Sequence, residues 1–192
     1  MFNIFDSHND LLFKYNKKQE IINYLHTQLA NVRKIFCAYF SYNNSKNASI
    51  DDMLCKFNFI KGVKSAVPAV ENCWFLNYKN LEKFILAMPF CATLSHNLNN
   101  SLCGGAMENG ELTSFGCDVV KQFEKNNIFI DTAHMNEKSF WQFCKLTNKP
   151  IFNSHTGFSF VYKHNRNLSD NQINEIVKSG GYIGFALYPK FF

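Results

Sequence analysis

Histidine and carboxylate side chains recur at five places along the 192-residue chain, and these residue types bind zinc-like ions. His8 and Asp10 are two residues apart, so their side chains point the same way if the segment is extended. The other candidates are Glu71, His96, His134 and His155. A carboxylate such as Glu71 can bridge two ions, and two ions would hold a hydroxide and polarise a carbonyl group. The residues therefore predict metal-dependent hydrolysis.

Short apolar runs alternate with amphipathic segments, which is the pattern of a parallel α/β fold. It predicts seven strands, over residues 2–7, 34–42, 63–70, 90–94, 128–131, 150–153 and 182–187. It also predicts six helices, over residues 18–32, 49–59, 79–87, 114–125, 136–146 and 169–179, with Ser49, Asn136 and Ser169 as N-caps. A closed barrel of this type has eight strands in about 250 residues, so the count is one strand short.

The candidate ligands all follow predicted strands, at the end where parallel barrels carry their working residues. Taken alone, each has a simpler explanation. The His-x-Asp pair could cap a helix or form a surface ion pair, Glu71 could be solvated, and His134 could be an ordinary loop histidine. Taken together, they favour a metal centre. We interpret His26, in a predicted helix, and His164, in a predicted loop, as structural residues.

The composition argues against nucleic-acid and membrane partners. The formal charge is +5, and the basic residues form no run that would make a nucleic-acid or lipid patch. We find no apolar stretch long enough to span a bilayer and no signal peptide at the start. The seven cysteines include no Cys-x-x-Cys pair, which predicts reduced, mostly buried thiols in a cytoplasmic protein. The length predicts a single domain over residues 1–192.

Two cysteines need a separate explanation, because Cys91 and Cys103 flank the segment that contains His96. A soft metal site is conceivable there, but we favour packing in the core, where free cysteines are common.

Several motifs resemble those of the membrane, or renal, dipeptidases, which form peptidase family M19. The chain opens with FDSHNDLL at residues 5–12, which resembles the family's first strand motif. It continues with TLSHN at 93–97, which resembles the fourth-strand motif. Two later stretches resemble the family's other histidine motifs. One is LTSFG at 112–116 with IDTAH at 130–134, and the other is PIFNSH at 150–155 followed by HNRNL at 164–168. The resemblance runs from residue 2 to about residue 190, with order and spacing kept.

This resemblance implies a TIM-type (β/α)8 barrel that uses two zinc ions to hydrolyse dipeptides. Carried over position by position, it implies that His8 and Asp10 bind the first ion. Glu71 would bridge the two ions, and His134 and His155 would bind the second.

The resemblance also implies roles for two residues that are not zinc ligands. His96 would stabilise the oxyanion of the tetrahedral intermediate. Arg166 would hold the C-terminal carboxylate of the dipeptide, for which a planar guanidinium suits bidentate pairing.

The chain departs from the family in two respects. The family has glycines around its bridging glutamate, whereas Glu71 is followed by Asn72 and Cys73. The family also carries a catalytic acid after its eighth strand, and Asp131 does not match that acid by position. We therefore expect a C-terminally truncated barrel with weak or absent dipeptidase activity. The chain would be a fragment, or another chain would supply the strand through homo-oligomerisation; we favour the fragment.

Two other functions stay open. One is a catalytically inactive remnant that binds a metal or a partner. The other is an amidohydrolase-type barrel acting on a cyclic amide, which a His-x-His motif after the first strand would favour. The chain has His-x-Asp there, at His8 and Asp10.

Overall fold

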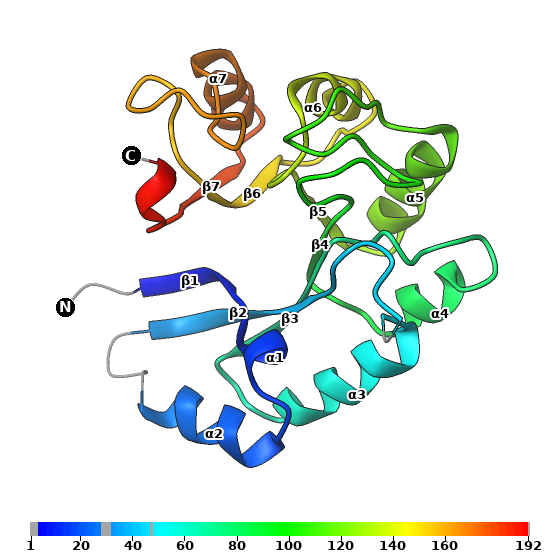
Figure 1. Ribbon diagram of the computed structural model, residues 1–192, viewed down its shortest axis with the longest axis vertical. Helices are drawn as coiled ribbons and strands as arrows, with labels where there is room; N and C mark the ends of the chain where they lie inside the picture. The colour runs from blue at the N-terminus through cyan, green and yellow to red at the C-terminus, as the bar shows by residue number, and fades with distance from the viewer. Residues whose placement is uncertain (1–3, 28–31, 47, 192) are drawn as a thin grey trace.

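Seven parallel strands form one sheet in the order of the chain, from β1 to β7. The computed structural model describes residues 4–27, 32–46 and 48–191. The strands are β1 (Ile4–Asn9), β2 (Val32–Phe40), β3 (Ala66–Glu71), β4 (Cys91–Thr93), β5 (Phe129–Asp131), β6 (Phe152–Thr156) and β7 (Tyr182–Phe185). The sheet curves into a nearly closed barrel with β1 and β7 at its two ends (Figure 1). The prediction of a TIM-type barrel is therefore confirmed.

The helices lie outside the sheet, on the connections between strands (Figure 1). They are α1 (Leu11–Lys14), α2 (Lys18–Thr27), α3 (Ile50–Ile60), α4 (Leu81–Leu86), α5 (Ser114–Lys125), α6 (Glu137–Cys144) and α7 (Asp170–Lys178), followed by a 3-10 helix at Pro189–Phe191. Ser49, Asn136 and Ser169 each accept a backbone N–H bond at a helix start, so the three predicted N-caps are confirmed.

The apolar core has two parts. The larger part lies between the sheet and the helices and includes Phe84 of α4 and Phe123 of α5, whose rings stack 5.1 Å apart. The smaller part gathers side chains from five consecutive strands: Phe36, Ala69, Cys91, Phe129 and Phe152. Because side chains alternate along a strand, this second cluster marks the inner face of the barrel, below the strand ends.

The two ends of the sheet, β1 and β7, come close together beside β6. The Ser7 hydroxyl of β1 donates a hydrogen bond to the Ser154 carbonyl of β6, at 2.6 Å. Gly184 of β7 lies against the same atoms, and a Cβ at this position would overlap both the Ser154 carbonyl oxygen and the Ser7 hydroxyl. The close approach of three strands therefore requires a glycine at position 184.

The predicted elements differ from the structure mainly at their ends. Helix 114–125 matches α5 residue for residue, whereas the helix predicted to reach residue 32 ends by Thr27 among the described residues, and Val32 begins β2. The β-branched Val32 pairs with Ile4 instead of extending the helical stripe. The short helix α1 and the final 3-10 helix were not predicted.

Among the described residues, no helix combines the length and apolar character that crossing a bilayer requires. All seven cysteines are free, and four of them are buried, including Cys91 and Cys103. Cys91 packs in the inner cluster and Cys103 in the main core, which agrees with core packing.

The capping box at the start of α7 gives a test of local stability. Ser169 accepts the N–H of Gln172, and the Gln172 side chain accepts the N–H of Ser169. We expect Ser169→Ala to lower the free energy of unfolding by about 1 kcal/mol, measured by urea denaturation. Ser169→Asp keeps an acceptor and should retain most of the stability. Equal losses in both variants would show that the cap is not the cause.

Candidate metal centre

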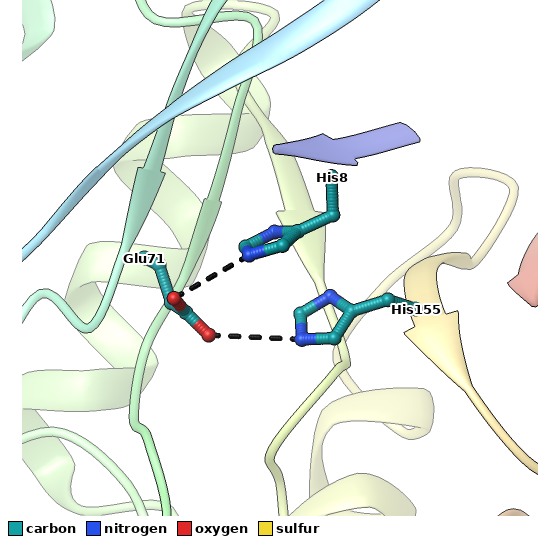
Figure 2. A group of neighbouring side chains, drawn as sticks. All are labelled: His8, Glu71 and His155. Carbon is teal, nitrogen blue, oxygen red and sulfur yellow. Dashed lines mark ion pairs between the residues drawn. The ribbon is translucent and has the colours of Figure 1, made fainter. Parts of the chain in front are cut away.

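The centre of the site is Glu71, the last residue of β3, whose side chain is only 6 % exposed. Four imidazoles surround its carboxylate. Its Oε1 lies 2.8 Å from Nε2 of His134, 3.6 Å from Nε2 of His155 and 3.9 Å from Nε2 of His96. Its Oε2 lies 3.5 Å from Nε2 of His8 (Figure 2). The candidates from five strands therefore meet at one mouth of the barrel.

Two of these histidines lie inside strands rather than after them. His8 is in β1 and His155 in β6, although the sequence predicted both at strand ends. Each sits within an interruption of the strand register, between Asp6 and Asn9 in β1 and between Asn153 and Thr156 in β6. Because an irregularity of this kind redirects side chains, both imidazoles can turn into the mouth.

The ligand atoms form two groups that share the glutamate. One group holds His8, Glu71 and His155, and the other holds Glu71, His96 and His134, each with its ligand atoms within 4.8 Å of one another. These imidazole nitrogens and carboxylate oxygens are the donor types that suit a divalent cation such as zinc. The sequence pattern had grouped His155 with His134 instead, and their Nε2 atoms do lie 3.0 Å apart.

Asp10 is the most peripheral candidate. It does not continue β1 but lies in the turn that begins α1, so the expected extended geometry is wrong. Its Oδ1 nevertheless lies 3.3 Å from Nε2 of His8, and its side chain is 59 % exposed. The carboxylate is therefore near the first group while remaining open to solvent.

Two partners that the sequence reasoning missed orient the histidines. Asn97 Oδ1 lies 3.0 Å from Nδ1 of His134, and Ser154 Oγ lies 2.7 Å from Nδ1 of His155. An amide oxygen only accepts, so the contact with Asn97 favours the His134 tautomer with its proton on Nδ1, which is the form whose Nε2 can bind a cation. Both partners adjoin a candidate histidine in the chain, which is the signal that could have identified them.

Two residues of the site have left-handed backbone. His134 has φ 67° and Asn72, directly after Glu71, has φ 68°, both in the left-handed region. Two hydrogen bonds hold Asn72 there. Its backbone N–H donates to Thr93 Oγ1 at 2.8 Å, and its side-chain amide donates to the Ser41 carbonyl, also at 2.8 Å. Asparagine tolerates this region better than most residues, so it can serve where glycine would be expected.

Asp131 links the two strands that carry the last two histidines. Its Oδ1 accepts the N–H of Ala133 at 3.0 Å and the N–H of Ser154 at 2.9 Å. These residues immediately precede His134 and His155 in the chain. The buried carboxylate thus fixes the backbone next to both imidazoles at once.

The electrostatics follow from burial of one carboxylate among imidazoles. Burial disfavours charge on His8, but the carboxylates of Glu71 and Asp10 raise the pKa of His8 to about 10. Burial opposes the charge on Glu71 as well, yet His8 and His134 hold the pKa of Glu71 well below its ordinary value. Burial lowers the pKa of His134 to about 3 and that of His155 well below its ordinary value. One imidazolium therefore balances one carboxylate.

Arg166 approaches the site from the loop after β6. Its Nη2 donates to the His155 carbonyl at 3.0 Å, and its guanidinium lies 5.6 Å from the Phe191 ring centre. The residue is only 5 % exposed, and burial lowers its pKa to about 10, against the influence of Glu71. The backbone N–H of Arg166 donates a hydrogen bond to Nδ1 of His164, which agrees with a structural role for His164.

Comparison with known proteins gives one family. The model of the membrane dipeptidases, peptidase family M19, matches residues 89–192. An uncharacterized dipeptidase of Schizosaccharomyces pombe is 24% identical over 194 residues, covering 97% of this chain and 46% of its own. An uncharacterized Klebsiella pneumoniae protein, from the 5′ region of pqqA, is 34% identical over 87 residues, covering 45% of this chain and 32% of its own. The chain thus spans less than half the length of these relatives.

Solved structures share the fold at low sequence identity. A metallo peptidase from Rhodobacter sphaeroides, bound to a phosphinate mimic of the dipeptide L-Ala-D-Ala, superposes with a TM-score of 0.81 at 17% identity and covers 99% of this chain and 75% of its own. An amidohydrolase from Pseudomonas aeruginosa superposes with a TM-score of 0.74 at 18% identity, covering 96% and 62%.

Removal of the Asp131 carboxylate should loosen both histidines. We expect Asp131→Ala to lower the free energy of unfolding by about 3 kcal/mol, because two buried N–H groups lose their acceptor. Zinc affinity, measured by competition with a chelator, should fall by about 10-fold to 100-fold. Asp131→Asn keeps an acceptor oxygen and should show smaller losses of both. Unchanged zinc affinity in the alanine variant would contradict this role.

The metal-free chain should lose stability on acidification. In the unfolded chain, histidines take up protons at about pH 6.5, whereas His134 and His155 stay neutral in the folded chain. Acid therefore stabilises the unfolded state relative to the folded state, and the free energy of unfolding falls. His8, with its raised pKa, works in the opposite direction and offsets part of this loss.

With a chelator present, we expect the free energy of unfolding in urea to be about 2 kcal/mol lower at pH 5 than at pH 7. His155→Gln should reduce this difference, because only His134 of the two then opposes protonation. A stability that increases towards pH 5 would contradict the argument.

Proposed function

Since the chain belongs to the membrane dipeptidase family, peptidase family M19, we propose that it acts as a zinc-dependent dipeptidase that hydrolyses the peptide bond of dipeptides. The single observation that carries the proposal is the buried Glu71 carboxylate, ringed by four imidazole Nε2 atoms within 3.9 Å. A buried carboxylate needs cationic partners, and two zinc ions would provide them.

The residues present fit a binuclear site. We propose that Glu71 bridges two zinc ions, that His8 and Asp10 hold the first, and that His134 and His155 hold the second. Bound zinc would polarise the scissile carbonyl and activate the attacking water. The orienting contacts of Asn97 and Ser154 favour imidazoles whose Nε2 atoms are available as ligands.

His96 and Arg166 would recognise the substrate. His96 is 25 % exposed, and burial lowers its pKa, so a neutral imidazole can donate an N–H to the oxyanion that develops on the carbonyl. Arg166 would bind the C-terminal carboxylate of the dipeptide, and its bond to the His155 carbonyl ties this end of the substrate to the metal site.

A second candidate function is a metal-binding chain without turnover. Besides Glu71, the buried carboxylate close in the chain to His134 is Asp131, and its Oδ1 already accepts two backbone N–H groups. A carboxylate held in this way is poorly suited to carry a proton to the leaving amine.

We further propose that residues 1–192 act as one barrel domain, that the protein is cytoplasmic, and that copies of it associate into a homo-oligomer.

Zinc content and dipeptide hydrolysis, measured on the same purified protein, separate the two functions. We expect two zinc ions per chain and release of free amino acids. Glu71→Gln should abolish hydrolysis and lower the zinc content, because a neutral amide bridges cations poorly. Glu82→Gln, on the outer surface of α4, should change neither. Two bound zinc ions without hydrolysis would support the non-catalytic function.

The role of His96 can be tested in the same way, since its Nε2 also lies within reach of an ion bound by Glu71 and His134. An oxyanion donor predicts that His96→Ala keeps both zinc ions and loses about 100-fold in kcat. Loss of one zinc ion in this variant would instead identify His96 as a ligand and overturn the oxyanion role.

A further inference from the structure

An unusual group of exposed aromatic side chains stands at the edge of the site. Phe13 of α1 is 51% exposed and Tyr42, just after β2, is 62% exposed. Both pack against Phe40, the last residue of β2, with ring centres 5.3 Å and 4.8 Å away. We call these three residues the aromatic wall. Large aromatic side chains that cluster at a surface commonly mark a binding site.

The aromatic wall adjoins the candidate metal centre directly. Phe40 pairs with Glu71 in the register of β2 and β3, and its ring centre lies 5.0 Å from that of His96. Side chains four residues apart on a strand point to the same face of the sheet. Phe36 packs in the inner cluster of the barrel, so Phe40 also points inward, towards the mouth and not towards the helices.

A small groove continues from the wall. It has a volume of about 250 Å³, and its apolar side is formed by Phe13, Phe40 and Tyr42 with Leu12, Tyr39 and Ala48, while Asn16, Ser41, Ser45, Asp52 and Lys56 form a polar side.

Together these observations point to a substrate class, and we infer that the site selects dipeptides whose N-terminal residue has a bulky apolar side chain. The inference rests on the proposed function. The carbonyl that His96 would face belongs to the N-terminal residue, and the side chain of that residue branches one bond away from it. The neighbouring aromatic wall is therefore the surface that this side chain meets first.

The test compares two phosphinate dipeptide mimics by calorimetric titration into the zinc-loaded chain. Both end in alanine, and they differ only in a benzyl or a methyl group on the N-terminal side. We expect the benzyl mimic to bind about tenfold more tightly. Phe13→Ala and Tyr42→Ala, both at exposed positions, should each reduce this ratio to about threefold or less. Tyr78→Ala removes an exposed aromatic ring that packs on Phe115, away from the mouth, and should leave the ratio unchanged.

The outcomes separate this inference from the proposed function. Equal binding of the two mimics, or a ratio that survives in both wall variants, would overturn the substrate class while leaving dipeptide hydrolysis intact. Failure of either mimic to bind, together with no hydrolysis of any dipeptide, would overturn both.

Discussion

The whole mouth of this barrel is organised around one electrostatic constraint, the burial of the Glu71 carboxylate. A charged group that leaves water must be compensated nearby, and in this chain the compensation comes from imidazoles in or just after four other strands. The arrangement is balanced without a metal only because one histidine takes up a proton while its neighbours stay neutral. Cations of higher charge would satisfy the same carboxylate more completely.

The parallel barrel makes this convergence possible. Residues 8, 71, 96, 134 and 155 are far apart in the chain, but every parallel strand delivers its carboxyl end to one mouth. Precise placement then depends on local devices: the register interruptions at His8 and His155, the Asp131 link between strands, and the orienting contact of Asn97. The fold brings the groups together, and these contacts set their orientation.

The sequence alone predicted the order of strands and helices and the residues that meet at the mouth, because hydrophobic periodicity and helix caps are local signals. Helix 114–125 and the cap at Ser169 are examples. It did not predict that His8 and His155 lie within strands, since a register interruption depends on the pairing partner. It also missed Asp131 as a link and the exposed aromatic residues beside His96, because both depend on contacts between distant segments.

The left-handed backbone at Asn72 has a consequence for how such sites are recognised from sequence. Where the sequence resemblance leads us to expect glycine, this chain forms a left-handed backbone with an asparagine whose side chain donates a hydrogen bond to the Ser41 carbonyl. The family match covers residues 89–192, so it does not include Glu71 or Asn72. The position requires a left-handed dihedral angle rather than asparagine itself, so Gly or Asp would be the replacements that this chain tolerates best there.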